Sequence, residues 1–348
     1  MQGICQRLGR WISPLVVITI AISGCDGPHR ERQRSDAAAL GEKLFLDARL
    51  SADGRTNCGT CHDPTRAFTD GNRTSTGAYG RTGTRNATSL LDVRHIEAFF
   101  WDGRERDLTE VVLQPLTNAV EHGNADLPAV VETLRSIPEY RTGFMRAFGR
   151  PPDRENIGQA LVEYVLSIDP GTTRLERYLA SGEEALLTHD ERAGLGLFKG
   201  KAGCAGCHVV DNDALLTDRN FHHAGVGFDR IAGGIAPLLQ RIDAAERAGL
   251  PLGRLALEDP DIAELGRFAA TREPAHLGAF RTPSLRNVAN TGPYMHDGSV
   301  PTLEAAIDRE LYYRGIALGR PISLTVEERQ QLLAFLHALS IEQPDRRD

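Results

Sequence analysis

Two pentapeptides of the same pattern, Cys-x-x-Cys-His, constrain this chain more than any other feature. The first is Cys58-Gly59-Thr60-Cys61-His62 and the second is Cys204-Ala205-Gly206-Cys207-His208. The pattern is typical of c-type haem attachment. In such a site the two cysteines form thioethers with the haem vinyl groups, and the histidine ligates the iron.

Two other chemistries use paired cysteines, and both fit this chain less well. A structural zinc site needs two cysteine pairs acting together, but these pairs are far apart and each carries its own histidine. A redox dithiol needs no adjacent histidine. We therefore expect two covalent haems, with His62 on the first iron and His208 on the second.

The length of 348 residues suits two domains, with one haem in each. Convincing alternating strands are few, so we predict a mainly α fold of two tandem c-type cytochrome domains. Their expected bounds are 37–185 and 186–348.

Apolar periodicity and capping boxes mark the expected helices. Residues 69–86 are rich in Gly, Thr, Arg and Ser, which favours a long loop. Residues 231–270 resemble an insertion that is first Gly-rich and then helical. The predicted helices are Ala37–Phe45, Leu127–Ile137, Asn156–Ile168, a helix opened by Thr188-x-x-Glu191 and ending at Gly200, and a closing helix opened by Thr325-x-x-Glu328 that carries Leu332, Leu333, Leu336 and Leu339.

The N-terminus reads as an export signal. Arg7 and Arg10 precede a short apolar run, Trp11–Ile22, which is typical of a secretory signal peptide. The run ends in Ile22-Ser23-Gly24-Cys25, which resembles a bacterial lipobox. We expect residues 1–24 to be removed, Cys25 to be lipidated and residues 25–36 to form a tether, so that the protein is periplasmic and membrane-anchored. An ordinary signal peptide cut nearby is the alternative.

The charge balance argues against a nucleic-acid partner. The chain has 40 Lys and Arg against 47 Asp and Glu, a net charge of −7. Loss of the leader with its two arginines would make the mature protein more acidic still. Nucleic-acid binding relies on basic surfaces, so we exclude that class of partner.

Several longer motifs resemble the bacterial dihaem cytochrome c peroxidases and their MauG-type relatives, over residues 37–342. This family uses two c-type haems to react with hydrogen peroxide, one with an open iron and one six-coordinate. The motifs are LFxDxRLS at Leu44–Ser51, AFTDG at Ala67–Gly71, FWDGR at Phe100–Arg104, and the long stretch Arg281–Glu304.

The resemblance assigns roles around the first haem. Peroxidases of this family cap the resting iron with a histidine in a Ser-Thr-Gly-His loop, but here that loop ends in Ala78. The first iron should therefore be open at rest, since His95 and His122 are poor substitutes. Glu121 matches the distal glutamate, Pro115 lines the same pocket and Trp101 lies between the haems. A surface acid and a plain core tryptophan are the alternatives.

At the second haem the peroxidases use a methionine fourteen residues after the histidine of the His-Asp-Gly motif, here His296. That position is Glu310, and no methionine follows Met295. MauG-type enzymes have a tyrosine ligand in a Tyr-x-Arg-Gly context. Tyr312 fits that context after an apparent two-residue insertion, with Tyr313 as the second choice.

Two further features follow from the resemblance. Asn86, Thr291 and Pro293 match the residues that hold a calcium ion between the domains, and a turn without metal is the alternative. MauG draws electrons from its protein substrate through a surface tryptophan, and that position here is Ala202. The route to a partner must therefore differ.

We thus expect a MauG-like oxidoreductase. Hydrogen peroxide would react at the first haem with the help of Glu121, and Trp101 would share the oxidising equivalents with the second haem. A partner protein or a donor cytochrome would supply the electrons. The alternatives are a cytochrome c peroxidase that detoxifies peroxide and a non-catalytic, lipid-anchored electron carrier.

Overall fold

The computed structural model describes residues 27–250 and 252–341. The predicted signal peptide and Cys25 lie outside these residues. Among the described residues, no helix combines the length and apolar character that a membrane crossing requires.

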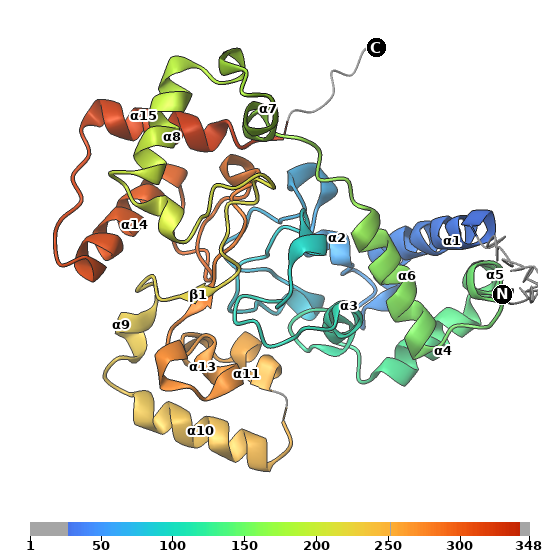
Figure 1. The fold of residues 1–348 in the computed structure, drawn as a ribbon. Coiled ribbons are helices and arrows are strands. Elements are labelled where there is room, and N and C mark those ends of the chain that lie inside the picture. Colours follow the sequence, from blue (N-terminus) through green and yellow to red (C-terminus); the bar gives the residue numbers. More distant parts are fainter. Residues whose placement is uncertain (1–26, 251, 342–348) are drawn as a thin grey trace, which may run out of the picture.

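The fold is mainly helical, as predicted (Figure 1). One short antiparallel pair, β1 (Phe221–His222) with β2 (Phe280–Arg281), joins His222 to Phe280 across the strands. The helices are α1 (Gly27–Leu46), α2 (Cys58–Cys61), α3 (Leu108–Thr117), α4 (Leu127–Ser136), α5 (Pro138–Phe148), α6 (Arg154–Ser167), α7 (Arg174–Ser181), α8 (His189–Lys199), α9 (Phe228–Ile231), α10 (Ile235–Arg247), α11 (Leu252–Glu258), α12 (Pro260–Ala263), α13 (Phe268–Thr271), α14 (Leu303–Ala317) and α15 (Val326–His337).

The helices expected from periodicity and capping are present, but α1 begins at Gly27, so residues 27–36 of the predicted tether are helical. Both predicted capping boxes form: the Thr188 hydroxyl accepts from the Glu191 amide, and the Thr325 hydroxyl accepts from the Glu328 amide. Residues 69–86 form a loop with one 3-10 turn, Ala78–Gly80. The predicted insertion holds α10 to α13 and has its own small apolar core around Ile242, which lies apart from the two main cores.

Each haem motif follows a helix that packs closely against a later helix. Helix α1 packs on α6, and α8 packs on α15 (Figure 1). In both pairs a glycine of the first helix meets the partner's backbone, Gly41 at the Ala160 carbonyl and Gly194 at the Gln331 carbonyl. A side chain at either glycine would collide with that carbonyl.

An aromatic contact follows each glycine contact by one helical turn. The Phe45 ring lies 5.1 Å from the Tyr164 ring, and the Phe198 ring lies 5.2 Å from the Phe335 ring. Gly-x-x-x-Phe is thus used twice, once in each helix that precedes a haem motif. The two halves share one design.

The likeness extends to the segments that follow each motif. Asp92 and Asn287 both adopt left-handed backbone angles, with φ of 64° and 63°, and each precedes a 3-10 turn. In the same register Trp101-Asp102-Gly103 corresponds to His296-Asp297-Gly298. Aligning the sequence of residues 88–103 with that of residues 283–298 reveals this repeat. The two haem motifs alone do not indicate that the segments after them are also similar.

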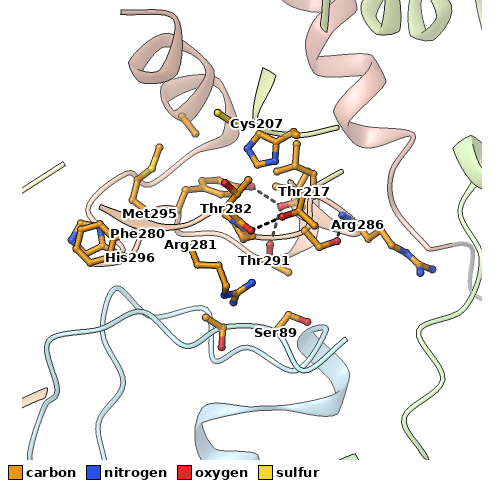
Figure 2. Close-up of a pocket in the computed structure, with 18 of the residues that line it drawn as sticks. Ser89, Cys207, Thr217, Phe280, Arg281, Thr282, Arg286, Thr291, Met295 and His296 are labelled. Atoms are coloured by element: carbon orange, nitrogen blue, oxygen red, sulfur yellow. Dashed lines mark hydrogen bonds between the residues drawn. The ribbon is translucent and has the colours of Figure 1, made fainter. Parts of the chain in front are cut away.

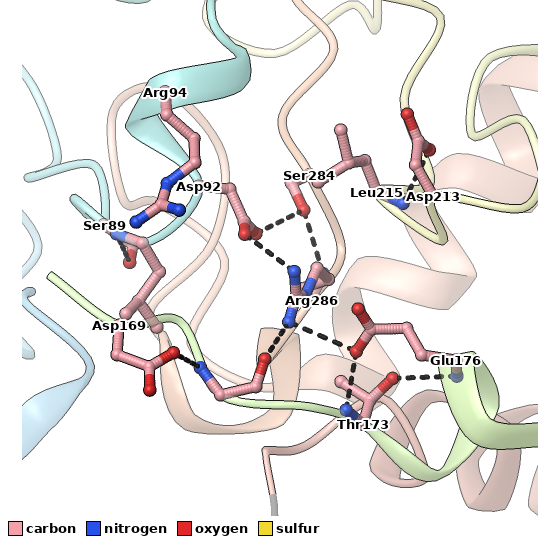
Figure 3. Close-up of polar contacts among 12 residues, drawn as sticks. Ser89, Asp92, Arg94, Asp169, Thr173, Glu176, Asp213, Leu215, Ser284 and Arg286 are labelled. Carbon is pink, nitrogen blue, oxygen red and sulfur yellow. Dashed lines mark hydrogen bonds and ion pairs between the residues drawn. The ribbon is translucent and has the colours of Figure 1, made fainter. Parts of the chain in front are cut away.

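One arginine of the second half contacts three separate points of the first half (Figure 3). Buried Arg286 of the second half contacts Asp92 of the first half at 2.9 Å. It also donates to the Gly171 carbonyl at 2.6 Å and lies 3.2 Å from Glu176 of α7. Because a buried guanidinium needs partners, these contacts fix three segments at one point.

The helix contact at Gly194 can be tested by substitution. Gly194→Ala should lower the free energy of unfolding by roughly 1–3 kcal/mol, since overpacking against backbone forces the helices apart. Gly196→Ala on the same helix is the matched control, because no atom lies within 4 Å of its added carbon. It should be neutral or stabilising by about 0.5–1 kcal/mol. Chemical denaturation measures both, and equal stabilities would contradict the close packing.

Candidate functional site

The first motif is built for covalent haem. Cys58 and Cys61 lie on the single turn of α2, and His62 follows as its C-terminal cap. The His62 Nδ1 donates to the Phe68 carbonyl at 3.1 Å, since a carbonyl can only accept. That bond fixes the tautomer and leaves Nε2 free to ligate iron.

The second motif repeats this geometry. Cys204 and the two residues after it form a 3-10 turn, and the His208 Nδ1 donates to the Leu216 carbonyl at 2.8 Å. Burial lowers the pKa of His208 to about 4, so the ring is neutral, as an iron ligand must be. Phe68 and Leu216 both have positive φ, 57° and 51°, which turns their carbonyls toward the histidines. The residues of both motifs therefore fit c-type haem.

Glu121 lies close to the first motif. Burial raises the pKa of Glu121 to about 7, against the opposing effect of Arg104. Its carboxylate also contributes to the raised pKa of the Cys58 thiol, after burial and the neighbouring Cys61. A carboxyl group that titrates near neutral pH can both accept and return a proton.

The loop that ends in Ala78 packs directly on this acid. The Ala78 amide donates to the Glu121 carbonyl at 2.7 Å, and Ala78 is fully buried. Pro115 of α3 lies beside the same segment, because its carbonyl accepts from the His122 amide at 3.2 Å. The structure thus brings Ala78, Pro115 and Glu121 together.

His95 and His122, which the sequence analysis judged to be poor substitute ligands for the first iron, lie in different places. His122 is buried, and its Nε2 lies 3.9 Å from the Cys58 sulfur, while its Nδ1 has no protein partner. Burial lowers the pKa of His122 to about 4, so its ring is neutral. His95 lines the cavity of the second motif instead.

A cavity of about 310 Å³ lies at the second motif and reaches the first half of the chain (Figure 2). Trp101 lines it, and its place between the two haem sites stays a prediction. The Trp101 indole donates to the Asn86 backbone carbonyl at 2.9 Å. The Asn86 backbone N–H in turn donates to the His296 carbonyl at 2.9 Å. The lining includes Trp101, Cys204, Cys207, His208, Phe280, Arg281, Met295, His296, Glu310 and Arg314.

The predicted calcium residues lie around the same cavity. Asn86, Thr291 and Pro293 all line it, although they come from both halves of the chain. The side-chain nitrogen of Asn86, Nδ2, donates to the Asn72 carbonyl at 2.9 Å. The side-chain oxygen of Asn86 therefore points away from Asn72. The structure therefore groups these residues, and metal binding stays a prediction.

The structure does not place Tyr312 where the sequence expected it. Tyr312 is 65% exposed on α14 and does not line the cavity, whereas Glu310 and Arg314 of the same helix do. Tyr313 is also turned away, since its hydroxyl donates to the Gly225 carbonyl at 2.9 Å. The physical reason is that α14 runs unbroken to Ala317, so Tyr312 lies about 200° around the helix from Glu310 and faces the other way.

A buried hydrogen bond at the cavity wall, between Glu264 and His296, was not anticipated. The Glu264 carboxylate lies 2.9 Å from the His296 Nε2, and both side chains are buried. The His296 ring stacks on Phe280 at 3.6 Å. Glu264 belongs to the predicted insertion, whose contact with the motif residues no local pattern could reveal.

Comparison with known proteins agrees with this geometry. The family described as di-haem cytochrome c peroxidase matches residues 35–184. Cytochrome-c peroxidase IdrP1 of Pseudomonas sp. (strain SCT) is 34% identical, over 91% of this chain and 84% of that protein. Methylamine utilization protein MauG of Methylorubrum extorquens is 33% identical, over 88% of this chain and 79% of that protein.

Solved structures give the same result. A MauG-like protein associated with microbial copper homeostasis superposes with a TM-score of 0.69 at 30% identity, over 88% of this chain and 90% of the other. The diheme peroxidase BthA of Burkholderia thailandensis superposes with a TM-score of 0.68 at 27% identity, over 88% and 86%. With two c-type haem sites in two cytochrome domains, the chain belongs to the di-haem cytochrome c peroxidase and MauG family of peroxidase-type oxidoreductases.

Proposed function

We propose that this protein is a MauG-like enzyme that reacts with hydrogen peroxide at its first haem and oxidises a partner protein through its second. The observation that carries this proposal is Ala78. The loop that would bear a capping histidine holds a methyl group instead, and it is packed on the Glu121 carbonyl. No side chain of that loop position can ligate iron, so the first haem should accept peroxide without prior activation.

Glu121 is positioned to move protons in this reaction. Reduction of one peroxide to two waters takes two electrons and two protons. When bound, the haem iron would supply the site at which those electrons reach the peroxide oxygen. The Glu121 carboxylate would accept a proton from the incoming peroxide and return it to the departing oxygen, as its pKa near 7 allows.

Trp101 would connect the first site to the second. Its indole lines the second cavity, and its hydrogen bond to Asn86 holds the ring in one orientation. From there the electron path to a partner cannot use the position of MauG's surface tryptophan. Ala202 is buried and has no ring that could relay an electron.

A cytochrome c peroxidase that takes electrons from a donor cytochrome is the second candidate. It is favoured by the relatives named cytochrome-c peroxidase, among them the cytochrome c551 peroxidase of Pseudomonas aeruginosa at 33% identity. The loss of both the capping histidine and the methionine ligand favours the MauG-like alternative.

Two further parts of the proposal rest on the sequence. Asn86, Thr291 and Pro293 would hold a calcium ion at the junction of the two halves, since oxygen donors suit that ion. Lipidation of Cys25 would anchor the protein to a membrane on the periplasmic side.

The open first site predicts the resting spectrum. The ferric protein as isolated should show one high-spin and one low-spin haem by electron paramagnetic resonance, because Ala78 leaves the first iron without a second ligand. The same sample should react with peroxide in stopped-flow mixing without added reductant. Two low-spin signals and no reaction would rule out the MauG-like proposal and leave an enzyme that needs activation.

The role of Glu121 predicts a pH-dependent rate. Peroxide must lose a proton to the carboxylate, so the wild-type rate should fall as pH drops below about 7, where Glu121 becomes protonated. Glu121→Gln should slow the reaction by roughly 10²–10⁴-fold and abolish this dependence. The control is Glu110→Gln. Glu110 is a partly exposed acid of α3 that pairs with Arg154. A Glu121→Gln rate within a few-fold of wild type would make Glu121 a structural residue.

The placement of α14 predicts which residue affects the second haem. Tyr312→Phe should leave the low-spin absorption and resonance spectra unchanged, because the ring lies outside the cavity. Glu310→Gln should alter them, because its half-buried side chain lines the cavity. The reverse result would show that α14 repacks around the haem and would restore Tyr312 as the ligand.

A further inference from the structure

Arg281 is a buried cation in the second cavity. It lies on β2, is 9% exposed and lines the cavity with Cys204, Cys207 and His208. Its backbone amide donates to the Trp101 carbonyl at 2.8 Å. The guanidinium Nε makes only a long bond, 3.4 Å, to the Phe100 carbonyl.

The other arginines around this cavity each have an acidic partner. Arg286 pairs with Asp92 at 2.9 Å and Arg219 pairs with Asp213 at 3.1 Å. Arg314 interacts electrostatically with Glu310 of the same helix. Arg281 has no such partner among the described residues: burial alone lowers its pKa, to about 10, and no carboxylate offsets the loss of solvation.

A buried charge without a counter-charge is strongly unfavourable, so a site of this kind is typical of a missing anionic group. The planar guanidinium matches a carboxylate in particular, through two parallel hydrogen bonds. Its location beside the second motif restricts the source of that carboxylate to something that occupies the cavity.

Haem itself carries two carboxylates, the propionates, on the edge opposite the vinyl groups. At this site the vinyl edge is fixed by Cys204 and Cys207, so the propionate edge must point away from them. Figure 2 shows Arg281 beyond Cys207, with its guanidinium turned across the cavity toward Ser89 of the first half. The cation therefore lies at the end of the cavity where a propionate is expected.

We propose that Arg281 binds a propionate of the second haem and neutralises it at the junction of the two halves. Because the Arg281 amide also bonds to the Trp101 carbonyl, the propionate is anchored directly beside the residue that connects the two haem sites. The charge on Arg281 favours the added electron of the reduced haem. This role requires only that the second haem is present, and it holds whether the enzyme oxidises a protein or a small donor.

The test uses the dihaem protein and two substitutions. Arg281→Gln should lower the reduction potential of the second haem, with the equilibrium constant for reduction falling by about tenfold, or about 59 mV for one electron. It should also shift the resonance Raman band of the propionates. Arg281→Lys keeps the positive charge but cannot donate two parallel hydrogen bonds to a carboxylate. The reduction potential of the second haem should therefore stay near the wild-type value while the propionate Raman band shifts.

Arg219→Gln is the matched control, since Arg219 lines the same cavity but is paired with Asp213 and exposed. It should change neither readout. If Arg281→Gln behaves like this control, Arg281 does not bind the propionate. Should the Gln variant fail to accumulate haem, Arg281→Lys still decides: an unchanged Raman band overturns the proposal.

Added anions separate a propionate from a free ligand. If Arg281 is occupied by a haem propionate, the potential and Raman band of the wild-type protein should not respond to phosphate or chloride at constant ionic strength. A saturable response in the wild type that is lost in Arg281→Gln would assign the site to a small exchangeable anion and overturn the proposal.

Discussion

The ion pair between Arg286 and Asp92 is a buried charge contact that joins the two halves of this molecule. A single guanidinium of the second half reaches Asp92, the Gly171 carbonyl and Glu176 of α7 in the first half. Burial makes each of these contacts costly to lose, because the remaining charge would have no solvent to replace its partner. The segment that follows Asp92 carries Trp101, so the position of that indole at the second cavity depends on this pair.

The two halves use the same backbone for different chemistry. Each has a glycine-to-backbone helix contact, a haem turn, and a histidine held by the carbonyl of a residue with positive φ. The equivalent positions then diverge: Trp101 in the first half corresponds to His296 in the second, which is paired with Glu264. The two halves thus differ at a few positions on a similar backbone.

Local features were predictable from sequence, and features that depend on distant packing were not. The haem motifs and the capped helices α8 and α15 follow from residues close together in the chain. Glu121 could be proposed from its match to the family, but its pKa near 7 depends on burial by several separate segments. Tyr312 was proposed from spacing along the chain, whereas the direction of its side chain depends on its turn of α14, and there it lies outside the cavity. Arg281 stands in a recognised motif, yet only the cavity reveals that it lacks an acid.

The two helix pairs also bear on the order in which the molecule can form. The contact of Gly41 with Ala160 encloses the first haem motif in sequence, and the contact of Gly194 with Gln331 encloses the second. Contacts between residues so far apart close late, because a long loop must lose its freedom before they stabilise anything. Until α6 and α15 arrive, Cys58 and Cys204 lie on chain segments whose principal helix pair is still open. Attachment of haem before this closure would let the helices fold over a cofactor that is already bound.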